Sequence, residues 1–248
     1  MVKDGILKYG QWSLKDVGEH WDRTTGYDEI NERTYSYFRR FVDGYRMASK
    51  DKLKHGIKIL DICARTGKGS AYFDNKKPGM KYVCMDLSRY QMKLCKILLK
   101  REKVKFEQRY FDSYKLPGKN KEFDYVLFFE TLEHIPQPDK FLKKLSRMMK
   151  PGAEMILSTP NIAWEFVHWF AGLTSIHHTE GPHRFLSRKE ILKDLRNAGF
   201  IVKREETTVL IPFGPRFITK FGEVLERIFK NTLMPLVGLR RIFICEKK

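Results

Sequence analysis

Hallmarks of secreted and membrane proteins are missing from this sequence of 248 residues. It has no run of about eighteen apolar residues, so no membrane-spanning helix is expected. Its start, MVKDGILKYG, carries charge and glycine where a signal peptide would need an apolar stretch. No C-x-x-C pair occurs, which predicts reduced thiols that are mostly core residues. The cysteines are Cys63, Cys84, Cys95 and Cys245. These absences favour a cytoplasmic protein.

Acidic residues are scarce relative to basic ones. The chain has 48 lysines and arginines against 30 acidic residues, which gives a net charge of +18. Such a field favours an anionic partner: RNA, an anionic membrane surface at which the protein would be peripheral, or a phosphorylated substrate. A merely soluble basic protein is the alternative. Part of this charge recurs at helical spacing in two stripes. The stripes are Lys140, Lys143, Lys144, Arg147 and Lys150, and Lys93, Lys96, Lys100 and Lys103.

Apolar runs alternate with helical segments from residue 57 onward. Seven runs are typical of buried strands, at 57–62, 81–87, 104–108, 125–129, 155–158, 200–210 and 240–246. Between them, Ser88 begins one predicted helix, residues 187–198 form another, and a helix around residues 141–149 is expected to end at Pro151-Gly152. This order predicts an α/β fold with a mostly parallel seven-stranded sheet and helices on both faces.

Two segments lie outside this alternation. We expect residues 1–52 to form a helical cap over one end of the sheet, ahead of a main domain at 53–248. Residues 211–238 are expected to be a helical insertion, because they separate the last two strands by more than a hairpin needs. One helical face of the insertion is apolar and carries Phe217, Phe221, Val224, Leu225, Ile228 and Phe229. That face either covers the protein's own core or lies against a membrane interface or an apolar substrate.

Three loops follow predicted strands, and open α/β sheets bind ligands at the carboxyl ends of their strands. In the first, Asp61 precedes a small-residue loop whose backbone amides can approach a ligand closely. The second begins with Asp86, which is well placed to bond ribose hydroxyls. The third contains Asp112 and Ser113, which can meet an adenine amino group. For each acid, a role as a helix cap or turn residue is the alternative.

The segment FDYVLFFETLEHIP at 123–136, followed by MKPG at 149–152 and STPN at 158–161, resembles the class I S-adenosylmethionine-dependent methyltransferases. The similarity covers residues 55–205 and is greatest to the branch that includes the ubiquinone-biosynthesis O-methyltransferases. It implies a Rossmann-like fold that binds S-adenosylmethionine, with Asp61 and its loop on the methionine part, Asp86 on the ribose and Asp112 near the adenine. The expected cofactor contacts are Asp61, Cys63, Ala64, Arg65, Gly67, Asp86, Leu87, Asp112, Ser113 and Glu130.

The first loop departs from the family's usual Asp-x-Gly-x-Gly-x-Gly pattern. Cys63 and Arg65 stand where the first two glycines are expected, and Gly67 remains. A side chain at either position can crowd the cofactor or resist a positive φ. A non-catalytic binding protein on the same fold is therefore an alternative.

The loop after the fourth strand supplies acid–base groups. The cofactor is already activated, so the protein mainly aligns the acceptor with the methyl group. A hydroxyl acceptor must also lose its proton to a base or through a metal. We expect His134 and Glu133 to be catalytic; the alternative for His134 is a loop histidine bonded to a backbone group. Together with Glu130 and the downstream His183, they also form a possible set of ligands for Mg²⁺, Mn²⁺ or Zn²⁺. This arrangement is similar to that of the ubiquinone enzymes and, including His183, of small-RNA 2′-O-methyltransferases.

Two classes of acceptor agree with these patterns. The aromatic residues Trp164, Phe166, Trp169 and Phe170 form either an apolar wall for an acceptor or a core helix. With the amphipathic insertion, they favour O-methylation of a small or lipid-like molecule. The net charge and His183 favour an RNA methyltransferase instead. The sequence thus predicts an S-adenosylmethionine-dependent methyltransferase and leaves the acceptor open.

Overall fold

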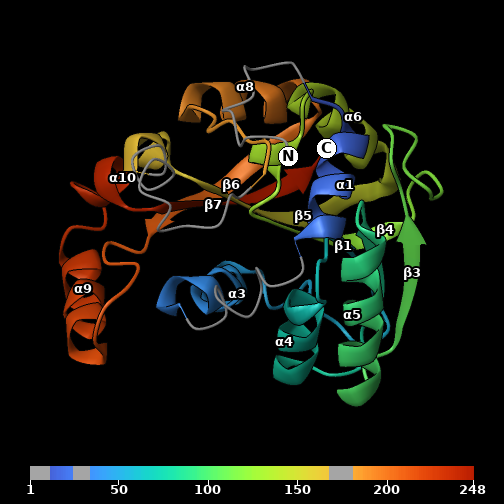
Figure 1. Cartoon of the computed structure of the whole chain (residues 1–248), viewed down its shortest axis with the longest axis horizontal. Coiled ribbons are helices and arrows are strands. Elements are labelled where there is room, and N and C mark those ends of the chain that lie inside the picture. Colours follow the sequence, from blue (N-terminus) through green and yellow to red (C-terminus); the bar gives the residue numbers. More distant parts are fainter. Residues whose placement is uncertain (1–11, 25–33, 168–180) are drawn as a thin grey trace.

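The computed structural model describes residues 12–24, 34–167 and 181–248. At its centre lies a seven-stranded sheet in the order β3-β2-β1-β4-β5-β7-β6 (Figure 1). The strands are β1 (Lys58–Ile62), β2 (Lys81–Asp86), β3 (Phe106–Tyr110), β4 (Phe123–Phe129), β5 (Met149–Pro160), β6 (Phe200–Thr208) and β7 (Arg240–Lys247). β7 is antiparallel to both of its neighbours, and the other pairs are parallel. This arrangement confirms the predicted α/β fold.

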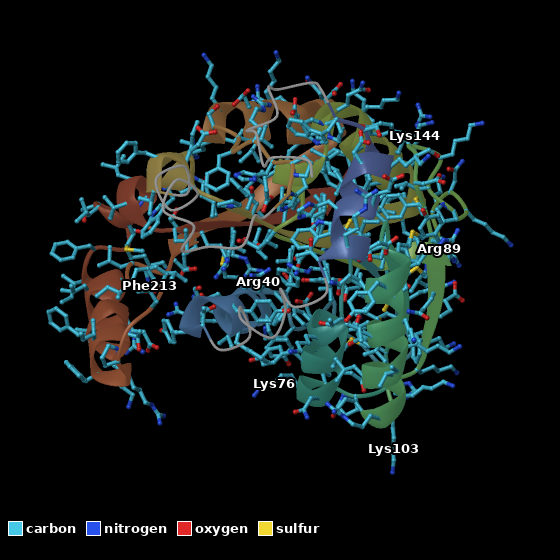
Figure 2. All side chains as sticks on the ribbon, in the orientation of Figure 1. Arg40, Lys76, Arg89, Lys103, Lys144 and Phe213 are labelled. Atoms are coloured by element: carbon cyan, nitrogen blue, oxygen red, sulfur yellow. The ribbon has the colours of Figure 1, made fainter. Side chains whose placement is uncertain are left out.

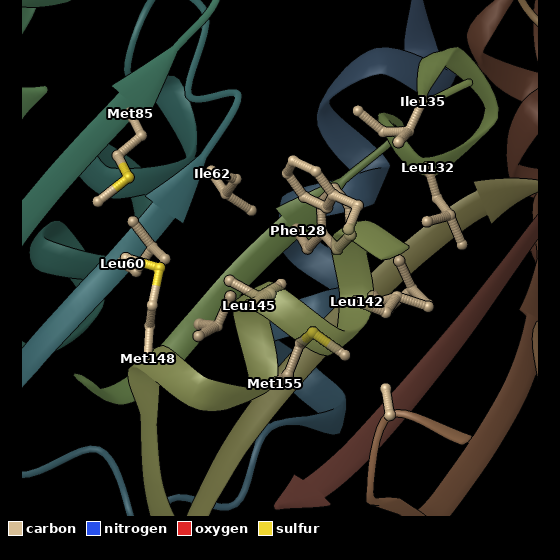
Figure 3. Packing of buried hydrophobic residues seen from close by; sticks show 14 of the residues in the cluster. Leu60, Ile62, Met85, Phe128, Leu132, Ile135, Leu142, Leu145, Met148 and Met155 are labelled. Carbon is tan, nitrogen blue, oxygen red and sulfur yellow. The ribbon is translucent and has the colours of Figure 1, made fainter. Parts of the chain in front are cut away.

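Helices cover both faces of the sheet (Figure 1). They are α1 (Leu14–Arg23), α3 (Tyr35–Met47), α4 (Lys68–Lys76), α5 (Arg89–Arg101), α6 (Pro138–Met148), α8 (Arg188–Asn197), α9 (Arg216–Ile228) and α10 (Met234–Val237), with short turns η1 (Leu132–His134) and η2 (Ile162–Trp164). Alternating residues of the central strands enter two separate cores. In β4, Val126 and Phe128 join a core with α1, α6 and α8 (Figure 3), whereas Tyr125 and Leu127 pack with α3, α4 and α5.

The sequence placed one boundary wrongly. The helix around residues 141–149 was expected to continue to Pro151-Gly152, but α6 ends at Met148 and both of those residues lie inside β5. Met149 already pairs with Phe123 of β4, so pairing with the neighbouring strand overrides the helical pattern. Helix α4 was not predicted at all. It begins directly after Gly67, which has φ of +80°.

Helix α1 approaches the sheet very closely. Its Ser13 and Asp16 form a capping box that fixes the first turn. One turn later, a Cβ added to Gly18 would lie 2.5 Å from the carbonyl oxygen of Leu87, so glycine is needed for this approach. Helices α1 and α3 lie within the predicted cap, and α9 and α10 lie within the predicted insertion. The division into a cap and a main domain stays a prediction.

The apolar face of α9 does not cover the protein's core. Most of the residues predicted to line this face are exposed, including Phe217 and Phe221. The first alternative for this helix is therefore wrong. In the described part of the chain, the helices are too short or too polar to cross a bilayer.

Candidate functional site

The loop between β1 and α4 is built on left-handed backbone. Cys63 and Arg65 have φ of +53° and +49°, and Gly67 has φ of +80°. Two side chains therefore occupy a conformation that usually favours glycine, at a cost of about 1–3 kcal/mol each. The amide of Ala64 donates to the carbonyl of Met85 at 3.1 Å, which ties the loop to the end of β2. Cys63 and Arg65 thus adopt the positive φ that glycine accommodates most easily.

Asp61, at the end of β1, anchors this loop to α4. Its Oδ2 accepts hydrogen bonds from the Ser70 amide at 3.1 Å and the Ser70 hydroxyl at 2.7 Å. Burial raises the pKa of Asp61 to about 7, although the bonds from Ser70 oppose the shift. The carboxyl group therefore changes its charge close to neutral pH.

Asp86, at the end of β2, joins two elements of the site. One carboxyl oxygen accepts from the Arg65 amide at 2.7 Å and the other from the Ser88 amide at 2.9 Å. Burial raises the pKa of Asp86 to about 6, with these amides opposing the shift. Since β1 and β2 are parallel neighbours, Asp61 and Asp86 lie at the same edge of the sheet.

A small cavity lies beside Asp86. Its volume is about 30 Å³, and it is lined by Val17, Trp21, Cys63, Arg65, Asp86, Leu87, Gln91, Glu130, Thr131, His134 and Ile135. Pockets for small-molecule ligands usually measure about 300–1,000 Å³. The Arg65 guanidinium lies 4.5 Å from the centre of the Trp21 ring, so a residue of α1 and the first loop meet at this cavity. Binding of a whole nucleoside would require these two side chains to separate.

The structure brings half of the predicted cofactor residues to this cavity. Cys63, Arg65, Asp86, Leu87 and Glu130 line it, whereas Asp61, Ala64, Gly67, Asp112 and Ser113 do not. The first three of these hold the loop in place. The last two follow β3 and have exposed side chains. The contact of Asp112 with the adenine stays a prediction.

Sequence reasoning missed Trp21, Gln91 and Thr131. Gln91 is 1% exposed, and its Oε1 has no hydrogen-bond partner among the described residues. An acceptor that is buried without a partner is costly, and such groups often meet a ligand. Together with the carboxylate of Asp86, this oxygen supplies hydrogen-bond acceptors suited to hydroxyl and amino groups. These acceptor oxygens fit the hydroxyl and amino groups of S-adenosylmethionine. The cavity in this structure is too small to hold that molecule.

His134 lies in η1 and is 9% exposed. Its Nδ1 is 2.9 Å from the carbonyl oxygen of Pro182. A carbonyl oxygen only accepts, so Nδ1 carries the proton and the neutral ring has its lone pair on Nε2. The ring also meets Trp21 edge to face, with the centroids 5.8 Å apart. This geometry keeps an imidazole in the wall of the cavity.

Glu130 forms an ion pair with Arg240. Its Oε1 accepts from Arg240 Nε at 3.0 Å and from the Ser158 hydroxyl at 2.9 Å. Burial raises the pKa of Glu130, but the charges of Arg240 and Arg40 outweigh it and leave that pKa below its ordinary value. The carboxylate is therefore ionised and paired at neutral pH.

The predicted metal ligands are not grouped. Glu133 accepts from the Thr159 hydroxyl at 3.1 Å and does not line the cavity. Nδ1 of His183 lies 2.9 Å from the carbonyl oxygen of Gly181, and its ring is 6.0 Å from that of His134. Within residues 12–24, 34–167 and 181–248, no three His, Cys, Asp or Glu side chains are arranged to hold a metal ion. The expectation of a divalent metal at Glu130, Glu133, His134 and His183 is thus not supported.

The structure describes two of the four residues of the predicted aromatic wall, Trp164 and Phe166. Trp164 donates from its indole nitrogen to the carbonyl of Val237 at 2.8 Å, which fastens η2 to α10. Phe166 is exposed. Trp169 and Phe170 lie outside the described residues.

Comparisons with known proteins agree with the predicted family and fold. A family model described as a methyltransferase domain matches residues 31–204. Among curated proteins, the chain is 27% identical over 153 residues to a phthiotriol/phenolphthiotriol dimycocerosates methyltransferase of Mycobacterium ulcerans, covering 62% of this chain and 54% of that protein. It is 29% identical over 120 residues to a ubiquinone biosynthesis O-methyltransferase of Pelagibacter ubique, covering 48% and 49%. The chain spans about half the length of these two relatives.

Solved structures share the whole fold. The cyclase SpnF superposes with a TM-score of 0.70 at 14% identity, covering 99% of each chain. A phosphoethanolamine N-methyltransferase of Haemonchus contortus, solved with S-adenosylmethionine, gives a TM-score of 0.68 at 17% identity, covering 93% of this chain and 60% of that one. The family model matches well over half of the chain. The chain therefore belongs to the class I S-adenosylmethionine-dependent methyltransferase family.

Proposed function

We propose that this protein transfers the methyl group of S-adenosylmethionine to an oxygen atom of a small, lipid-like acceptor. The observation that carries the cofactor half of the proposal is the junction of the first two strand ends. Asp86 accepts from the amides of Arg65 and Ser88, and the loop holding Arg65 has left-handed backbone at Cys63, Arg65 and Gly67. This junction offers hydrogen-bond acceptors for the cofactor at the carboxyl edge of a Rossmann-like sheet.

The chain's own residues divide the work of binding. Asp86 and Gln91 offer hydrogen-bond acceptors to the nucleoside, and the loop at residues 63–67 lies beside the methionine part, with Asp61 holding that loop against α4. Arg65 and Trp21 separate to admit the cofactor and then exclude water. When bound, S-adenosylmethionine supplies an activated methyl group.

His134 is the proposed base. Its Nδ1 proton is held by the carbonyl oxygen of Pro182, so Nε2 can take the proton of an acceptor hydroxyl. Glu133 gains no contact with the cavity in this structure and is assigned no step. The lipid-like acceptor is supported by the names of the relatives, which act on phthiotriol lipids and in ubiquinone biosynthesis.

The test uses the radiolabelled methyl group of S-adenosylmethionine and two acceptor pools, a lipid extract and total RNA. We expect label in the lipid pool, present as a methoxy group by mass spectrometry. His134→Gln is expected to keep cofactor affinity and lose about 10²–10⁴-fold in turnover, the usual contribution of a positioned base. Label found only in RNA would contradict the proposed lipid-like acceptor. Cofactor binding without transfer of the labelled methyl group to either pool would contradict the proposed methyltransferase activity.

A further inference from the structure

Helix α9 is mounted with its polar side inward. Glu226 Oε2 accepts from Arg39 Nη2 at 2.8 Å, and Tyr35 donates to Glu223. Both partners lie on α3, so the two acids of α9 are turned toward the body of the protein. Thr219 and Gly222 are the buried residues of the helix. Ion pairs and small residues, rather than an apolar stripe, attach α9 to the protein.

The outward side of α9 is apolar. Phe217, Phe221 and Ile228 are 73%, 60% and 65% exposed, and they lie at helical spacing on one stripe. Val224 of the same helix is exposed too, and so are Phe213 before the helix and Phe229, Leu233 and Leu236 after it. Contiguous exposed apolar surface on a soluble domain marks an interaction site. Figure 1 places α9 and α10 at the end of the molecule opposite α5 and β3, and Figure 2 shows Phe213 at that same end.

Cations flank this apolar stripe. Arg216, Lys220 and Arg227 are exposed, and none has a carboxylate partner in the described part of the chain. The acids that would neutralise them are engaged with α3. The outer surface of the helix therefore presents apolar groups and positive charge together, on a chain whose net charge is +18.

We propose that the apolar outer face of α9 and α10 docks this protein on an anionic lipid bilayer. Phenylalanines would enter the boundary between headgroups and acyl chains, and the flanking cations would contact lipid phosphates. A second copy of the chain is a poorer occupant, because a symmetric interface would bring the same cations together. RNA is also a poorer occupant, because beside its phenylalanines the face exposes the aliphatic residues Val224, Ile228, Leu233 and Leu236, on which bases do not stack. The docking surface lies apart from the cofactor site and does not depend on the proposed activity.

The test is co-sedimentation of the full chain, without cofactor, with vesicles of phosphatidylcholine alone or with about one third phosphatidylglycerol. We expect at least about tenfold stronger partitioning onto the anionic vesicles, weakened by salt. The double variant Phe217→Ser/Phe221→Ser is expected to lose about tenfold or more of that partitioning, because two exposed rings no longer insert. Ile97→Ser, at an apolar residue of α5 that is 58% exposed, is the control and should bind unchanged.

Three results would overturn the proposal. The first is wild-type chain that stays in the supernatant with anionic vesicles. The second is a double variant that sediments like the wild type. The third is a dimer in light scattering that the double variant dissociates, which would assign the face to a second copy. Thermal melting of each variant confirms that these exposed substitutions leave the fold intact.

Discussion

Arg240→Met is predicted to destabilise the protein strongly, because it leaves a buried carboxylate without its main partner. The Arg240 side chain is 2% exposed and that of Glu130 is 14% exposed, and Nε and Oε1 are 3.0 Å apart. Removing one member of a buried pair usually costs about 3–5 kcal/mol. Arg40 also adds positive potential at Glu130, which places the expected loss near the lower limit. A loss of about 3 kcal/mol corresponds to a fall of about 6–12 °C in Tm for a chain of this length.

Differential scanning calorimetry measures this effect, and two further variants test its origin. In Glu130→Gln/Arg240→Met both charges are gone, so we expect a smaller loss than for Arg240→Met alone and a coupling free energy above about 1 kcal/mol. Lys143→Met breaks an exposed pair with Asp139 at 3.5 Å and is expected to cost about 0–0.5 kcal/mol. The reasoning is refuted if Arg240→Met shifts Tm no more than Lys143→Met does.

The same pair gives a pH dependence. The pKa of Glu130 is lowered in the folded protein, so its stabilising contribution is complete above the ordinary carboxyl value and is lost as the pH falls through the folded value. The difference in Tm between wild type and Arg240→Met should therefore shrink in acid. An unchanged difference at low pH would show that the arginine acts through packing alone.

Three further predictions concern the cofactor site. Arg65→Gly is expected to speed association of S-adenosylmethionine in stopped-flow fluorescence, because the guanidinium no longer closes the cavity against Trp21; equal rates would contradict that gating. Burial raises the pKa of Asp61 to about 7 and that of Asp86 to about 6, so affinity should rise with pH through this range as the carboxyl groups ionise. Calorimetry in two buffers should also show proton release on binding, and a flat profile would argue against these acids. Gly18→Val should displace α1 and lower Tm, since the Cβ of the new side chain would clash with the Leu87 carbonyl oxygen. An unchanged Tm would show that α1 can move away without loss of stability.

The alternation of strands and helices was predictable because each element carries its own period. The seven strands of the sheet match seven predicted runs. The start of β5 was not predictable, since Met149 joins the strand through pairing with Phe123 of a neighbouring strand. Helix α4 has a weak apolar pattern, and its beginning depends on the left-handed Gly67. Local patterns thus predicted the strands and several of the helices but not α4, and contacts between strands decided where β5 begins.

The candidate site was predictable only where its residues follow strands. Asp86 is the last residue of β2 and Asp61 the last but one of β1, so their position at one edge of the sheet follows from the parallel order. Trp21 reaches the cavity from a helix that precedes the first strand, and no local signal indicates that approach. For α9, the sequence contains the apolar stripe. Which side of the helix faces the protein depends on Arg39 of α3, a helix far away in the sequence.

Isothermal titration with S-adenosylmethionine tests the central claim most directly. The account predicts that the wild-type chain binds one cofactor and that Asp86→Ala, folded by circular dichroism, loses about 100-fold or more in affinity through the lost carboxylate contacts. Asp139→Ala, at an exposed acid, should bind like the wild type. A wild-type chain that does not bind the cofactor, or an Asp86→Ala variant that binds it equally well, would contradict the account.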